Sequence, residues 1–175
     1  MKIISVILLL CCVMVLSCGD DKSSESQTES IENTNQNAKI TAKTIENIDY
    51  KDYALSPESE KMIVTWERYQ ELAMQINYLK KADFSFFNGD KELLKKFIDE
   101  FKSQIPEEVK TNPTMSRIAI IETSLLKLNE NLTIDNIERK DKITGIKDVF
   151  VAFSNLNYQI NRKLERDFYD KIQHE

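Results

Sequence analysis

The residue types that most often carry catalysis or bind metals are few in this sequence and poorly placed for either role. The only histidine is His174, next to the last position, and the three cysteines, Cys11, Cys12 and Cys18, all lie within the first 18 residues. A metal centre in a helical bundle needs paired Glu-x-x-His motifs, and thiolate sites need cysteines that a fold can position. We therefore predict no catalytic residue, no cofactor and no metal, and expect that the protein is not an enzyme.

Two further patterns give no support to an enzyme or a nucleic-acid-binding protein. Ser124 and Lys127 have the Ser-x-x-Lys spacing of serine β-lactamases, but the other motifs of that family are missing. With 13 Ser and 19 Lys in 175 residues, chance alone produces about one such spacing. Three glycines cannot build a Gly-rich phosphate loop. A net charge of −5 leaves no cationic excess for nucleic acid, so no nucleic-acid partner is predicted.

The N-terminus has the order of a secretory signal peptide. Lys2 supplies a positive charge, residues 3–16 are apolar except for Ser5, and the small residue Ser17 precedes Cys18. The apolar stretch would be about 22 Å long as a helix, against about 30 Å for the hydrocarbon core of a bilayer. We predict a signal peptide at residues 1–17, cleaved between Ser17 and Cys18.

The four residues Val15-Leu16-Ser17-Cys18 resemble the lipobox of bacterial lipoproteins. They depart from it in having Val and Leu where the family prefers Leu and then a small residue. The resemblance implies acyl chains such as palmitate on Cys18, and two or three chains anchor a protein stably to a membrane. The expected location is therefore the cell envelope, with the outer membrane favoured. An uncleaved membrane anchor or a secreted protein without lipid is the alternative.

Residues 18–56 are predicted to be a lipidated cysteine followed by a disordered polar tether. From residue 19 to 56 there is no Phe, Trp or Met, so little apolar surface is available to offset the entropy of ordering. Asp20 and Asp21 resemble the export tag of surface lipoproteins in the Bacteroidota. The alternative is that this acidic pair only begins a polar segment, which leaves the periplasmic or surface side open.

Residues 57–175 are predicted to form an all-α, antiparallel helical bundle of about four helices. Apolar residues recur there at intervals of three and four, and the scarcity of Gly and Pro disfavours a turn-rich β fold. The expected helices cover residues 57 to about 82, 90–105, 112 to about 132, and about 141 to 173. The third has the most regular heptad pattern, which consists of Ile118, Ile121, Leu125, Leu128 and Leu132.

Two polar or aromatic clusters are candidates for a partner surface. Phe84, Phe86 and Phe87 could dock a protein, or they could cover one end of the bundle. Asn157 and Asn161 belong to an amide-rich band that could pair across the core, line a binding face or lie in solvent.

The segments Phe86-Phe87, Ile105-Pro106, Ser116-Arg117-Ile118 and Leu156 to Asn161 resemble a group of small, uncharacterised helical lipoproteins of flavobacterial (Bacteroidota) type. The resemblance implies a helical bundle at a membrane but no chemistry. We predict a non-enzymatic protein-interaction module with a protein partner in the envelope, such as an accessory subunit or an inhibitor or immunity-type factor. The alternative is a binding module for a small apolar or glycan ligand between helices.

Overall fold

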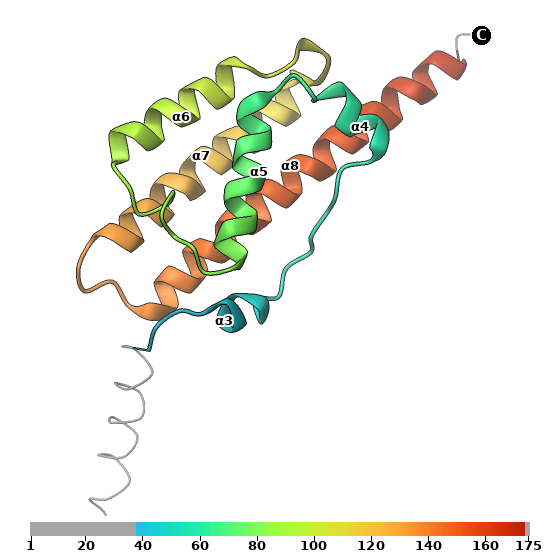
Figure 1. Cartoon of the computed structure of the whole chain (residues 1–175). Coiled ribbons are helices and arrows are strands. Elements are labelled where there is room, and N and C mark those ends of the chain that lie inside the picture. Colours follow the sequence, from blue (N-terminus) through green and yellow to red (C-terminus); the bar gives the residue numbers. More distant parts are fainter. Residues whose placement is uncertain (1–37, 174–175) are drawn as a thin grey trace, which may run out of the picture. The chain divides into compact units, whose positions relative to one another are not determined.

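The computed structural model describes residues 38–173, so the predicted signal peptide and Cys18 lie outside the described part of the chain. Within it every regular element is helical, and the all-α fold is confirmed (Figure 1). The elements are α3 (Ala42–Glu46), α4 (Pro57–Met62), α5 (Glu67–Lys80), α6 (Lys91–Ser103), the 3-10 helix η2 (Glu107–Val109), α7 (Asn112–Thr133) and α8 (Arg139–Gln173).

The antiparallel pair of α7 and α8 forms the centre of the bundle (Figure 1). Ile118, Ile121, Leu125 and Leu128 on α7 are all buried, as the heptad pattern predicts, while Leu132 is only partly buried. Gly145 lets α8 approach α7 closely, because a Cβ atom there would lie 3.1 Å from Asn131 Nδ2. Helix α6 packs on α7, and α5 packs on α6.

Side chains cap the N-terminal ends of α6 and α7. Asp90 caps α6, because its carboxylate accepts hydrogen bonds from the backbone N–H groups of Glu92 and Leu93. Helix α7 begins at Asn112, as expected, is capped by the side chain of Thr111, and has a proline in its first turn.

The first predicted helix is broken into two, which corrects the expectation of one helix over residues 57–82. Helix α4 ends at Met62, and α5 begins at Glu67. The break contains Ile63-Val64-Thr65, three consecutive β-branched residues that disfavour a helix. It allows α4 to pack on α8, while Trp66 enters the core and donates from Nε1 to the carbonyl of Phe101 at 2.8 Å.

The packed unit begins at Lys39 and not at Pro57, so the predicted domain boundary is wrong. We name residues 39–56 the strap. Ile40 and Ile45 of the strap are buried, and Ile48, Tyr50 and Leu55 pack against the core. These side chains offset the ordering entropy that the polar composition was expected to leave uncompensated. The rest of the predicted tether, residues 18–37, lies outside the described residues.

The C-terminal end of α8 extends past the other helices of the bundle (Figure 1). Its apolar stripe is buried as far as Ile160 and continues through Leu164, which is partly exposed, to Phe168 and Ile172. Phe168, Tyr169 and Ile172 are 63%, 64% and 53% exposed. We name residues 164–173 the α8 tip. No helix among residues 38–173 is both long and apolar enough to cross a membrane.

Candidate functional site

Three polar side chains on one face of α8 hold the backbone of the strap. Ser154, Asn157 and Asn161 follow at intervals of three and four residues, so they share one helix face. Ser154 Oγ accepts from the Tyr53 N–H at 2.7 Å and donates to the Lys51 carbonyl at 2.6 Å.

The two asparagines continue the same contact. The Asn157 Nδ2 donates to the Tyr53 carbonyl, and the Asn161 Nδ2 donates to the Ala54 carbonyl, both at 2.9 Å. The Asn161 Oδ1 accepts from the Ser56 N–H at 2.9 Å. The amide band therefore binds the chain's own strap, about 100 residues earlier in the sequence.

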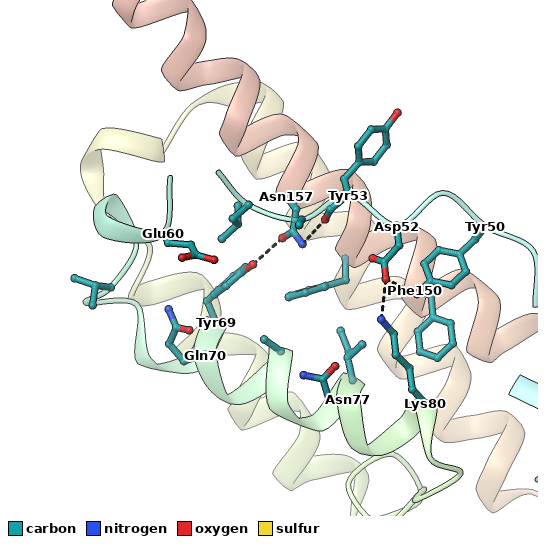
Figure 2. A pocket seen from close by; sticks show the side chains of 16 residues that line it. Tyr50, Asp52, Tyr53, Glu60, Tyr69, Gln70, Asn77, Lys80, Phe150 and Asn157 are labelled. Carbon is teal, nitrogen blue, oxygen red and sulfur yellow. Dashed lines mark hydrogen bonds and ion pairs between the residues drawn. The ribbon is translucent and has the colours of Figure 1, made fainter. Parts of the chain in front are cut away.

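The attached strap closes one side of an open cavity of about 690 Å³, which we name the strap cleft (Figure 2). A volume of this size is typical of small-molecule sites. The cleft lies between the strap, α4, α5 and α8. Its floor is apolar, and the side chains that form it include Leu55, Ala73, Ile76, Phe150 and Phe153.

A charged pair occupies one end of the strap cleft. Lys80 Nζ lies 2.8 Å from Asp52 Oδ2, which also accepts from the Tyr50 hydroxyl at 3.0 Å (Figure 2). Burial acts to raise the pKa of Asp52, but the hydrogen bonds from Lys80 and Tyr50 outweigh it and hold that pKa below its usual value. The same contacts raise the pKa of Lys80 against the opposite effect of burial. Both groups are therefore ionised and matched to each other at neutral pH.

The other end of the strap cleft has acceptors and no cation. Glu60 and Gln70 lie there beside the ring of Tyr69 (Figure 2). The Tyr69 hydroxyl donates to Asn157 Oδ1 at 2.7 Å. Burial, and secondly the negative charge of Glu60, raise the pKa of Tyr69, so the phenol stays protonated.

A second hollow, of about 520 Å³, lies beside the α8 tip. Met62 of α4 forms one wall, and Leu164 and Phe168 of α8 form the other. Glu58 and Lys171 stand on its rim, and neither makes an ion pair with another described residue. We name this hollow the tip groove.

The structure does not place the five predicted partner-surface residues on one surface. Phe87 is fully buried, Phe86 packs edge-on against Phe87 and Phe97, and Phe84 is partly buried. This packing favours the alternative that the cluster covers an end of the bundle. Asn157 is buried, and Asn161 makes hydrogen bonds with the strap.

Two other sets of residues from the sequence analysis are the predicted cleavage site and the Ser-x-x-Lys spacing. Ser17 and Cys18 lie outside the described residues. Ser124 lies on the buried face of α7, whereas Lys127 is exposed and its ammonium lies 3.0 Å from Asp148. Ser124 and Lys127 therefore do not form a joint site. Among residues 38–173, no group of three or more His, Cys, Asp or Glu side chains is arranged to hold a metal ion.

Sequence reasoning missed both hollows. The apolar strap residues are spaced too irregularly to predict a structure, and Glu60 lies on a helix that was expected to continue straight into α5. The extension of the α8 stripe through Phe168 and Ile172 was visible, but nothing in the pattern marks where the bundle ends. Comparisons of the chain with protein families, with curated proteins and with solved structures gave no match.

Proposed function

We propose that this chain is a lipid-anchored, non-enzymatic protein-interaction module of the cell envelope. Its partner surface is the α8 tip with the tip groove, and its partner is an amphipathic helix of another envelope protein. The observation that carries this proposal is the exposed apolar stripe of the α8 tip.

The spacing of the exposed residues favours a helical partner. Leu164, Phe168 and Ile172 follow at intervals of four, which is the pattern with which one helix packs along another. Exposed apolar surface that continues a core stripe is costly to leave in water, and such patches commonly mark interaction sites. Glu58 and Lys171 on the rim offer one charge of each sign to fix the orientation of the partner.

The membrane anchor rests on the N-terminal sequence. The lipobox-like residues before Cys18 and the short apolar stretch support lipidation and an envelope location, with the outer membrane favoured. A protein held at a membrane meets partners in the same membrane at high local concentration, so a surface of modest size is enough for association.

The test is photocrosslinking in cells with a benzoylphenylalanine at position 172, compared with one at position 93. Leu93 is 69% exposed and lies on α6, away from the tip groove, so it controls for accidental contacts. The expected result is one discrete crosslinked protein from position 172, none from position 93, and attachment within an amphipathic helix of the captured protein. Introducing Phe168→Asp should abolish the crosslink without lowering the melting temperature, because Phe168 is exposed.

Two results would contradict this function. One is equal crosslinking from positions 172 and 93, which would show that the α8 tip is not a specific surface. The other is a product formed only between two copies of this chain, which would make the tip a dimer interface.

A second candidate function is a binding module for a small ligand between helices. The strap cleft favours it, because its volume and its apolar floor with polar groups at both ends match the usual anatomy of ligand sites.

A further inference from the structure

The Glu60 carboxylate and the Tyr69 hydroxyl oxygen lie at one end of the strap cleft, and both can accept hydrogen bonds from a ligand. The exposed side chain of Glu60 makes no hydrogen bond or ion pair with another described residue, and it lies at the cleft (Figure 2). Gln70 is exposed, and its Nε2 donates to the Ile63 carbonyl at 3.4 Å. The Tyr69 hydroxyl donates a hydrogen bond to Asn157. Its oxygen keeps lone pairs that can accept a hydrogen bond.

The cleft contains no lysine or arginine that could neutralise Glu60. Lys80 is the one cation among the side chains that line it, and Asp52 pairs with that ammonium at the opposite end. Ten residues of α5 separate Gln70 from Lys80, which is about 15 Å along the helix axis. The charge of Glu60 therefore lacks a local partner.

Apolar side chains line much of the surface between the two ends, with the amide of Asn77 among them (Figure 2). Ala73 and Ile76 on α5 and Phe153 on α8 line it, and the Tyr69 ring stacks on Phe153 with 5.2 Å between ring centroids. A ligand that fits this surface has an uncharged, apolar body beside whatever group reaches Glu60.

We propose that the strap cleft binds a small organic cation, a primary amine with an apolar body, whose ammonium contacts Glu60 and the hydroxyl oxygen of Tyr69. An ammonium group has three N–H donors and no acceptor, so it can donate to the carboxylate and to the phenol oxygen together. The adjacent aromatic ring adds an attraction for the cation. A carboxylate ligand would be repelled by Glu60, and a sugar hydroxyl would supply no charge. This ligand site is separate from the α8 tip, so a test of ligand binding and a test of the proposed function have independent outcomes.

The test is isothermal titration calorimetry of the full chain in detergent solution with three probes of the same shape. The probes are 2-phenylethylamine, 2-phenylethanol and 3-phenylpropionate, which differ in the charge and hydrogen-bonding of one terminal group. We expect the amine to bind at least tenfold more tightly than either of the others, because a charge-assisted hydrogen bond contributes more than a neutral one.

Two variants separate the site from general effects of charge and detergent. Glu60→Gln should weaken amine binding about tenfold or more and leave the affinity for the alcohol unchanged. Glu67→Gln removes the same charge from the exposed start of α5, outside the cleft, and should bind the amine like the wild type. Partition of the probes into micelles is the same for all three proteins and cancels. Circular dichroism should show equal melting temperatures, since both glutamates are exposed.

Equal affinities for the amine and the alcohol would overturn the proposal, as would an unchanged amine affinity in Glu60→Gln. Tighter binding of 3-phenylpropionate would overturn it too, because that result would assign the cleft to anions through Lys80. None of these results would bear on the α8 tip, whose crosslinking is measured at a different surface.

Discussion

At the residue scale, hydrogen bonds from three side chains of α8 hold the backbone of the strap in place. Ser154, Asn157 and Asn161 together satisfy five backbone groups of the strap. Asn157 also connects the strap to α5, because its Oδ1 accepts a hydrogen bond from the hydroxyl of the buried Tyr69. Every buried side-chain nitrogen and oxygen among the described residues has a hydrogen-bond partner, so removing one partner leaves another group unsatisfied.

Asn157→Ala should lower the free energy of unfolding by about 2 kcal/mol, because the Tyr69 hydroxyl and the Tyr53 carbonyl each lose a partner. Asn155→Ala is the matched control, since Asn155 lies two residues away and makes no hydrogen bond through its side chain to another described residue. Urea unfolding of both variants measures the difference. A loss in Asn157→Ala no larger than in the control would mean that the strap is not held as described.

At the element scale, α7 contains two adjacent isoleucines with opposite environments. Ile121 is 3% exposed, on the buried face of α7, whereas Ile120 is 45% exposed. The heptad pattern predicts this difference, because only Ile121 belongs to the stripe.

Ile121→Asp should therefore lower the free energy of unfolding by about 3 to 5 kcal/mol, as it buries a carboxylate without a partner. Ile120→Asp introduces the same group on the same helix and should cost about 1 kcal/mol or less. Thermal melting followed by circular dichroism distinguishes them. Similar melting temperatures for the two variants would show that α7 is not packed with Ile121 inward.

The long helices could be predicted from sequence because their evidence is local. Asp90 and Thr111 cap their own helices, and the apolar stripes of α6, α7 and α8 repeat within a few residues. The break before Trp66 has a local signal as well, the β-branched run that precedes it. The apolar periodicity across the break concealed that signal, because Met62, Trp66 and Tyr69 keep helical spacing.

The strap and the two candidate sites could not be predicted, because their evidence is not local. Asn161 and Ser56 are 105 residues apart in the chain, and no pattern around either residue indicates the other. The Phe84 to Phe87 cluster does have a local sequence signal, but that signal fits two interpretations. Its composition fits both a docking surface and a cover for the bundle end, and only the packing of Phe86 on Phe97 distinguishes the two.

At the scale of the whole molecule, two separate surfaces serve two proposed tasks. The α8 tip offers exposed apolar side chains to a helix, whereas the strap cleft offers an acceptor-lined end to a small cation. Neither surface has a histidine or cysteine among the described side chains that line it. Both depend on α8, whose strap-binding face closes the cleft and whose last turns form the tip.

The proposed anchor would connect these surfaces to a cellular location, and it depends on Cys18 alone. If Cys18 is lipidated, a labelled palmitate supplied to cells should be incorporated into the protein, and the protein should sediment with membranes. Cys18→Ser should abolish incorporation and leave a larger, unprocessed precursor, while Cys12→Ser should be labelled like the wild type. Labelling of Cys18→Ser at the wild-type level would contradict the assignment of this chain as a lipoprotein anchored through Cys18.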